Sequence, residues 1–118
     1  PRLFRNNRDG TFADVTDAMG ITGPRVGLSC WTWDYDNDGW PDVFATSYDR
    51  TLDDLIRGLV GQPHARETSR LYRNLGGKGF ADVTAEAGLG DCFSAMGTNF
   101  GDLDNDGFPD FYLGTGDH

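Results

Sequence analysis

The sequence predicts an all-β protein built from tandem four-stranded antiparallel blades of the β-propeller type. Its 118 residues include 17 Gly, 3 Trp, 4 Tyr and 8 Phe, a composition typical of short aromatic strands joined by tight turns. The chain also repeats itself at a fixed period, and each repeat carries one nine-residue acidic loop between two apolar segments. Four short strands per repeat match the make-up of one propeller blade.

An internal duplication spans the chain. A shift of 68 residues gives 18 identical pairs among the 50 overlapping positions, with no gap. The aligned segments are two strand-like stretches and the acidic loops: residues 2–6 with 70–74, 12–16 with 80–84, and 34–42 with 102–110. We therefore expect a single repeat domain over residues 1–118, with repeat 1 at 1–68 and a partial repeat 2 at 69–118.

Short apolar and aromatic runs predict the strands. In chain order these runs are residues 2–6, 12–16, 28–33, 43–47, 70–74, 80–84 and two within 95–115. The pair Asp9-Gly10 indicates a hairpin between the first two, because such turns need residues that tolerate a positive φ. Gly20 and Gly88 are expected to end single helical turns in the C′ position.

One segment departs from the β pattern. Four apolar residues recur there at helical spacing, namely Leu52, Leu55, Ile56 and Leu59. Thr51 precedes them as a candidate N-cap, with Asp54 three residues later. We expect a short helical insertion at about residues 51–60, with its apolar stripe used for packing.

The predicted strands leave half-blades at both termini. Residues 2–16 correspond to the last two strands of a blade, 28–84 to a whole blade, and 95–115 to the first two strands of another. Each half would expose an unpaired strand edge, which proteins normally avoid. The start at Pro1, without an initiator Met, indicates a processed mature chain or an excerpt from a longer one. Either the chain is part of a larger protein, or the C-terminal half-blade of one copy pairs with the N-terminal half-blade of the next. Such a head-to-tail contact gives a ring or a filament.

The two acidic loops have the spacing of a calcium site. Aspartates stand at loop positions 1, 3, 5 and 9, glycine at position 6 permits a sharp turn, and the carbonyl of position 7 offers another oxygen. The predicted ligands of the first loop are Asp34, Asp36, Asp38, the Trp40 backbone oxygen and Asp42. Those of the second loop are Asp102, Asp104, Asp106, the Phe108 backbone oxygen and Asp110.

All-oxygen ligation with several carboxylates favours Ca²⁺ over Mg²⁺, and we expect two Ca²⁺ ions per chain. The net charge is −9, and eight of the 19 acidic residues lie in the two loops. The alternative is that each loop is merely a polar turn. Repetition of all four aspartates argues against this, because clustered carboxylates repel one another without a cation. Asp14 and Asp82 recur outside the loops and are expected to accept hydrogen bonds from turn amides.

The loops, together with Leu3-Phe4-Arg5-Asn6-Asn7 and Gly10-Thr11-Phe12-Ala13-Asp14-Val15-Thr16, resemble the FG-GAP/VCBS repeats. The similarity is greatest to secreted bacterial proteins and cartilage acidic protein relatives that carry an ASPIC/UnbV domain. It covers nearly the whole chain except the insertion at 49–68. It implies propeller-type blades, Ca²⁺ held by the eight loop aspartates, and an extracellular setting, as in integrin α heads. The chain has too few blades for the family's closed ring and shows no ASPIC/UnbV region.

Cys30 and Cys92 are the only cysteines in the sequence. In an oxidising compartment they could form a disulfide within or between chains. If reduced, they are expected to be small buried residues.

The sequence favours a binding or structural role over an enzyme. His64 and His118 are isolated, and no pattern of a nucleophile, a zinc site or a phosphate-binding loop is visible. No basic stripe indicates nucleic acid, and no apolar run is long enough to span a membrane. The first hypothesis is a non-catalytic, extracellular structural protein that self-assembles head to tail. The alternative is a fragment of a larger adhesive or ligand-binding propeller that contacts protein or glycan.

Overall fold

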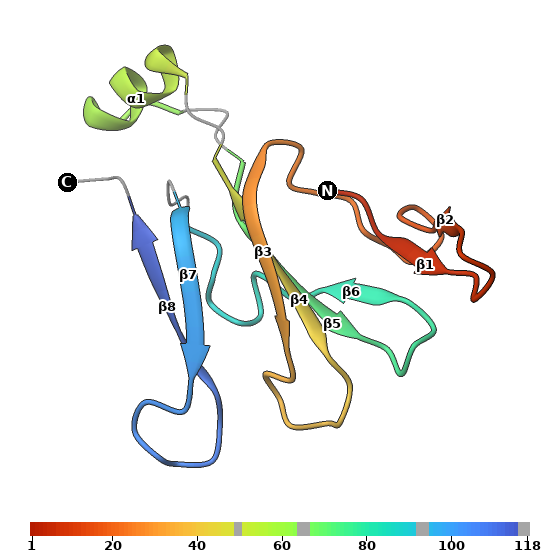
Figure 1. The fold of residues 1–118 in the computed structure, drawn as a ribbon. Helices are drawn as coiled ribbons and strands as arrows, with labels where there is room; N and C mark the ends of the chain where they lie inside the picture. The colour runs from red at the N-terminus through yellow and green to blue at the C-terminus, as the bar shows by residue number, and fades with distance from the viewer. Residues whose placement is uncertain (49–50, 64–66, 92–94, 116–118) are drawn as a thin grey trace.

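The computed structural model describes residues 1–48, 51–63, 67–91 and 95–115, and this part of the chain is almost entirely β structure. The strands form three antiparallel sheets that stand side by side (Figure 1). The elements are β1 (Phe4–Asn6), β2 (Phe12–Asp14), β3 (Gly27–Trp33), β4 (Asp42–Ser47), α1 (Leu52–Leu59), β5 (Arg70–Asn74), β6 (Phe80–Asp82), β7 (Ala95–Gly101) and β8 (Asp110–Thr115).

The central sheet contains β3, β4, β5 and β6 in that order. Neighbouring strands are antiparallel, and Phe44 of β4 stands opposite Trp31 on one side and Leu71 on the other. Aromatic and β-branched side chains fit such a pleated, half-buried surface, which explains why these segments form strands. The predicted four-stranded antiparallel blade is confirmed.

Two-stranded sheets flank the central blade. The β1–β2 pair has the register of β5–β6, because Phe4 stands opposite Asp14 as Tyr72 stands opposite Asp82. The β7–β8 pair likewise has the register of β3–β4 around the loop that joins its strands. The duplication seen in the sequence therefore extends to strand pairing. The repeat boundary at residues 68 and 69 stays a prediction.

An aromatic core joins the central blade to the β7–β8 sheet. Trp33, Phe44 and Leu71 are buried, and Trp31 and Phe111 pack against them. The ring of Phe44 lies 4.8 Å from that of Trp31 and 5.2 Å from that of Phe111, centroid to centroid. Full burial of an apolar side chain of this size contributes about 1.5–3 kcal/mol. The core therefore fixes β7–β8 against the blade and, with it, the relative position of the two acidic loops.

The single turns after β2 and β6 end at glycine, as predicted. Gly20 and Gly88 adopt φ values of +81° and +74°. The amide after each glycine bonds the carbonyl five residues earlier, at 3.1 Å for Ile21 and 2.9 Å for Leu89. This hydrogen bond, with a left-handed glycine before it, defines a Schellman motif.

The helical insertion is confirmed as α1. The Asp54 amide donates a hydrogen bond of 3.1 Å to the Thr51 hydroxyl, which makes Thr51 the N-cap. The packing role expected for the apolar stripe is wrong at Ile56, which is 52% exposed. The stripe's other side chains lie outside the described part of the structure: Leu52, Leu55 and Leu59.

Two details differ from the expectations. Cys30 is exposed instead of buried, because β3 alternates and its even-numbered residues face away from the aromatic core. Cys92 lies outside the described residues, so a disulfide stays a prediction. His64 and His118 also lie outside them.

The β1–β2 turn differs from the expected Asp9-Gly10 turn in one residue. Its left-handed residues are Arg8 and Gly10, at φ 65° and 89°.

Candidate metal centre in the acidic loops

The first loop (residues 34–42) joins β3 to β4, and the second loop (residues 102–110) joins β7 to β8. Both lie at the same end of the molecule, opposite α1 (Figure 1). The side-chain Nδ2 of Asn37 donates a hydrogen bond of 2.9 Å to the Gly107 carbonyl, so the loops touch. The two candidate sites are therefore neighbours on one face.

The loops curl because two residues in each adopt a left-handed backbone. Gly39 and Gly107 have φ values of +89° and +91°, which confirms the turn-forming role predicted for position 6. Asn37 and Asn105 at position 4 also have positive φ, at 57° and 58°. Asparagine tolerates this conformation better than most residues, which explains why it recurs there.

The aspartate at position 1 closes each loop. The carboxylate of Asp34 accepts hydrogen bonds from the amides of Asp38 and Gly39, at 2.9 and 2.8 Å. Asp102 does the same for Asp106 and Gly107, both at 3.0 Å. These bonds pull positions 5 and 6 back towards position 1, so the loop wraps around a point.

Three carboxylates converge in each loop. Asp34, Asp36 and Asp42 each offer one oxygen, and these oxygens lie within 4.8 Å of one another. In the second loop the converging residues are Asp102, Asp104 and Asp106. The convergent groups thus comprise six of the eight predicted carboxylate ligands.

The remaining two aspartates, Asp38 and Asp110, are not among these converging groups. Asp38 accepts a hydrogen bond of 2.9 Å from the Trp40 amide and faces Arg73. Asp110 accepts a hydrogen bond of 2.9 Å from the Leu103 amide. The ligand roles of these two residues stay predictions, as do those of the Trp40 and Phe108 backbone oxygens.

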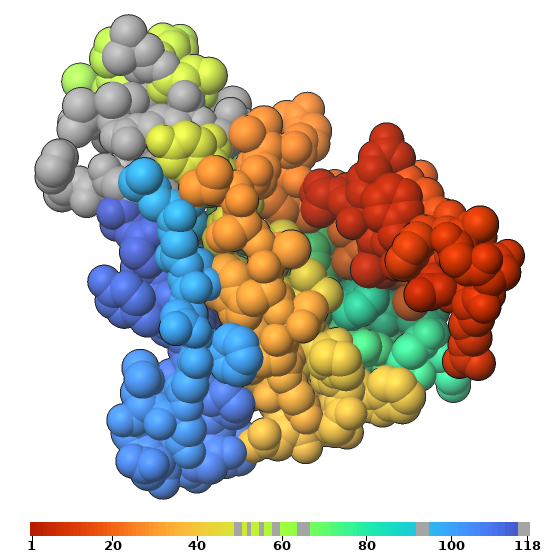
Figure 2. Space-filling model, in the orientation of Figure 1, coloured from red at the N-terminus to blue at the C-terminus, as the bar shows by residue number. Residues whose placement is uncertain are grey.

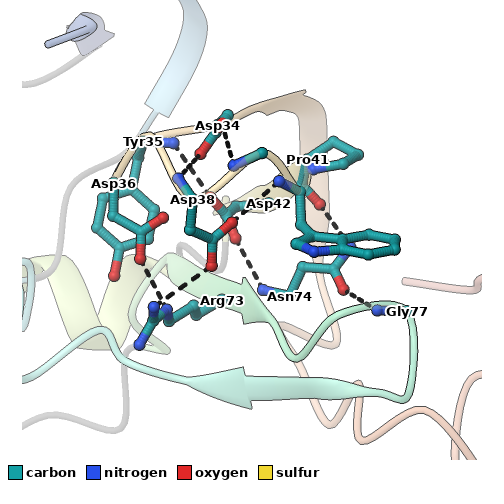
Figure 3. Close-up of polar contacts among 11 residues, drawn as sticks. Asp34, Tyr35, Asp36, Asp38, Pro41, Asp42, Arg73, Asn74 and Gly77 are labelled. Carbon is teal, nitrogen blue, oxygen red and sulfur yellow. Dashed lines mark hydrogen bonds and ion pairs between the residues drawn. The ribbon is translucent and has the colours of Figure 1, made fainter.

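Asp42 is the deepest carboxylate of the first loop, with no exposed surface. Its two oxygens accept hydrogen bonds from the amides of Tyr35, at 3.1 Å, and Asn74, at 2.7 Å (Figure 3). Burial raises the pKa of this carboxyl despite those two bonds. A positive charge close to Asp42 would therefore be strongly favoured.

Arg73 of β5 faces the first loop and was not anticipated as a site residue. Its guanidinium lies 2.7 Å from Asp36 and 3.3 Å from Asp38, atom to atom (Figure 3). The charge of Asp36 raises the pKa of Arg73. One feature of the sequence could have pointed to Arg73: the pair Arg73-Asn74 recurs as Arg5-Asn6 in the other repeat. Both residues of the first pair contact the loop, because the Asn74 amide also donates a hydrogen bond to Asp42.

The donor set fits a hard divalent cation. It consists entirely of oxygens, most of them carboxylate oxygens, as Ca²⁺ prefers. Asp36 Oδ1 is buried and accepts no hydrogen bond from the described residues, although buried carboxylate oxygens normally have a partner. Arg73 supplies one positive charge to a loop with four carboxylates, so an excess of negative charge remains.

Asp14 and Asp82 take the turn-bonding role predicted for them. Asp14 accepts hydrogen bonds from the Thr16 amide and hydroxyl, and Asp82 accepts the same pair from Thr84. The hydroxyl of Thr16, its amide and Arg2 lower the pKa of Asp14 to about 2. These aspartates organise the turn after the hairpin and lie outside the carboxylate clusters.

A family comparison identifies the kind of protein. The model of the FG-GAP-like repeat matches residues 1–45 and 34–113, and the chain belongs to this family. FG-GAP-like repeats are structural or binding repeats of β-propeller type, in agreement with the blade observed here. Comparison with curated proteins and with solved structures gave no match. In the part of the chain that the structure describes, no helix has the length and apolarity of a membrane span.

Proposed function

We propose that this chain is a non-catalytic calcium-binding module in which each acidic loop holds one Ca²⁺ ion and thereby stiffens its strand pair. The observation that carries this proposal is the convergence of Asp34, Asp36 and Asp42, with one oxygen of Asp36 buried and without a hydrogen-bond donor. A bound divalent cation would give that oxygen a partner. It would also offset the mutual repulsion of the clustered carboxylates.

The proposed stiffening of each strand pair follows from the positions of the ligands in the chain. Asp34 follows β3, and Asp42 is the first residue of β4. A cation shared by these residues would tie the end of one strand to the start of the next. Asp42 also bonds Asn74 of β5, so the effect would extend to a third strand. The second loop offers the same link between β7 and β8.

An extracellular location suits this role. Calcium outside cells is abundant enough to saturate even weak sites, and a ligand that binds only the folded state stabilises it by mass action. At a free concentration 100 times the dissociation constant the gain is about 2.7 kcal/mol per site. A change of 1 kcal/mol shifts the Tm by about 4–8 °C in a domain of about 60–100 residues and by about 2–4 °C in one of about 150–250 residues, and this chain of 118 residues lies between them.

A non-catalytic role agrees with the arrangement of polar groups. The clustered carboxylates belong to the loops, where a cation would engage them. Outside the loops, Asp9 and Asp14 have pKa values that are lowered by hydrogen bonds from threonine. A general acid needs a raised pKa near neutrality instead.

Thermal unfolding with calcium and with EGTA tests the proposal. The wild-type chain should melt several degrees higher in 2 mM CaCl₂, a concentration of about the extracellular level. The double variant Asp36→Ala, Asp104→Ala, which removes a ligand oxygen from each loop, should lose this difference. Asp17→Ala, on an exposed turn outside the loops, should keep it. Equal melting temperatures of the wild-type chain in calcium and in EGTA would refute the proposal.

A further inference from the structure

Two contacts join the acidic loops to one another. The side-chain Nδ2 of Asn37 in the first loop donates a hydrogen bond of 2.9 Å to the Gly107 carbonyl in the second. Just before the loops, the ring of Trp33 at the end of β3 stacks on that of Phe100 in β7, with the centroids 5.9 Å apart. Figure 2 shows the contact at the lower end of the molecule, where the blue second loop adjoins the orange and yellow first loop. The conformation of one loop is thus tied to that of the other.

The hydrogen bond from Asn37 ends on a peptide group that organises the second loop. The Gly107 carbonyl and the Phe108 amide belong to this one peptide group. The amide donates a hydrogen bond of 2.8 Å to Asp106, which is one of the three converging carboxylates. The peptide group is therefore held at both ends, by Asn37 on one side and by a candidate metal ligand on the other. Hydrogen bonds in such a series polarise and strengthen one another.

Asn37 is in turn held by the first loop. The peptide group that follows Asn37 contains the Asp38 amide, and this amide donates a hydrogen bond of 2.9 Å to Asp34. Asp34 is a converging carboxylate of the first loop, and so is Asp36, the residue directly before Asn37. The left-handed backbone at Asn37, with a φ of 57°, belongs to the same turn. A continuous path of bonds thus runs from the candidate ligands of one loop to those of the other.

We propose that Asn37 couples the two loops, so that a Ca²⁺ ion in either loop raises the calcium affinity of the other. The proposal rests on the calcium role of the loops. Without an ion, the converging carboxylates repel one another and work against the closed turn. An ion in the first loop holds that turn closed and fixes the position of Asn37. Asn37 then holds the Gly107–Phe108 peptide group in place, so the second ion binds a loop that is already partly ordered.

The size of the coupling follows from the contact that carries it. One hydrogen bond between neutral groups makes a net contribution that corresponds to about a two- to tenfold change in an equilibrium constant. We therefore expect calcium in one loop to raise the calcium affinity of the other by about two- to tenfold. The effect is reciprocal, because the change that one ligand causes in the affinity for a second ligand equals the reverse change.

Electrostatic repulsion between the ions acts in the opposite direction. Each loop carries four aspartates, and an ion in one loop weakens the attraction of the other loop for a second ion. Salt screens this effect, since the Debye length is about 8 Å at an ionic strength of about 0.15 M. Replacing Asn37 by an uncharged residue leaves the charges of both loops unchanged. The comparison of such a variant with the wild-type chain therefore isolates the contribution of the hydrogen bond.

Calcium titration of the whole chain at physiological ionic strength tests the proposal. The coupling factor is the overall constant for binding two ions, divided by the product of the two single-site constants. One single-site constant comes from Asp104→Ala, which leaves the first loop intact, and the other comes from Asp36→Ala, which leaves the second loop intact. Introducing Asn37→Gly into all three chains should lower the coupling factor by about two- to tenfold.

Asn105→Gly is the matched control. Asn105 stands at the same position of the second loop with a φ of 58°, and its side chain forms no hydrogen bond with the described part of the chain. Glycine tolerates a positive φ, so both substitutions remove a side chain without straining the turn. Asn105→Gly should leave the coupling factor unchanged. A coupling factor that Asn37→Gly does not lower, or that both variants lower equally, would overturn the proposal.

Amide hydrogen exchange gives a readout that a merely structural role of Asn37 would not change. In Asp104→Ala the second loop lacks one ligand, so added calcium binds the first loop. Calcium should then slow the exchange of the Phe108 amide, in the second loop, by about two- to tenfold. This slowing should be absent in the double variant Asn37→Gly, Asp104→Ala. Exchange of the Phe108 amide that calcium leaves unchanged in Asp104→Ala would contradict the proposed path.

The titration also separates this proposal from the calcium proposal. A wild-type chain that binds no calcium overturns both. Two bound ions with the same coupling factor in the wild-type chain and in Asn37→Gly overturn only the coupling. Two bound ions with a coupling factor that falls in Asn37→Gly, and not in Asn105→Gly, support both.

Discussion

At the scale of single residues, Arg73 and Asn74 explain how a strand outside the first loop holds that loop in shape. The guanidinium pairs with Asp36 and Asp38, and the Asn74 amide bonds the buried Asp42. β5 thus contributes both a positive charge and a hydrogen-bond donor to the carboxylates. The shape of the first acidic loop thus depends on three strands, although its sequence signature lies within nine residues.

Replacing Arg73 distinguishes the contribution of its charge to stability from the contribution of a bound cation. We expect Arg73→Met to lower the Tm in EGTA, because Asp36 and Asp38 lose their positive partner. In calcium the deficit should shrink, since the ion would supply the missing charge. Differential scanning fluorimetry in both buffers checks this, with Lys78→Met as a control on an exposed turn. Equal deficits with and without calcium would contradict the expectation.

The lowered pKa of Asp14 predicts that stability depends on pH at a site outside the acidic loops. Its pKa is about 2 in the folded chain, against about 3.9 in an unfolded one. A lowered pKa means that the ionised carboxylate stabilises the fold above about pH 4, and that this stabilisation is lost as the pH falls towards 2. Asp14→Ala should therefore lower the Tm at pH 6, and the difference from the wild-type chain should narrow between pH 4 and pH 2. Two melting curves that stay parallel down to pH 2 would argue against this role.

At the scale of the elements, the duplicated hairpins and turns allow matched substitutions. Gly20 and Gly88 share a positive φ, but only Gly20 has a carbonyl oxygen at 2.8 Å from its would-be Cβ. Alanine should cost about 1–2 kcal/mol at either position through backbone strain. At Gly20 the close approach of Phe80 should add to that cost. Urea unfolding of Gly20→Ala and Gly88→Ala, in EGTA and at low concentration, measures the difference, and equal losses would show that the contact is unimportant.

The elements were the part of the molecule most predictable from sequence. Strands, single turns and the capped helix follow from local patterns, namely alternation, glycine after a turn and threonine before a helix. The exposure of Cys30 and Ile56 could not be predicted in this way, because it depends on which face of an element another element covers. Because side chains alternate along β3, Cys30 lies on the face opposite to that of Trp31 and Trp33. Its exposure would have followed from the sequence if the face that packs in the core had been known.

The candidate site was predictable in composition but not in arrangement. The aspartates at positions 1 and 3 converge in both loops, as their spacing indicates. Position 9 joins the cluster only in the first loop, and position 5 only in the second. The sequence is the same at both positions, so the difference comes from neighbours: Arg73 stands beside Asp38, and no described residue takes that place beside Asp106.

At the scale of the whole molecule, duplication places two equivalent loops at one end of adjacent sheets. The aromatic core between β3–β4 and β7–β8 sets their separation, and the contact from Asn37 to Gly107 joins them. The two half-blades extend the same repeat in both directions. Membership of the FG-GAP-like repeats agrees with this plan, since repeated blades bury their apolar faces against neighbours.

Calcium in the loops is the central claim, and a crystal structure of the chain grown in calcium tests it most directly. Diffraction data collected at a long wavelength give an anomalous signal from calcium at each site. We predict one peak among Asp34, Asp36 and Asp42 and a second among Asp102, Asp104 and Asp106. Well-ordered loops without a peak at either position would contradict the account.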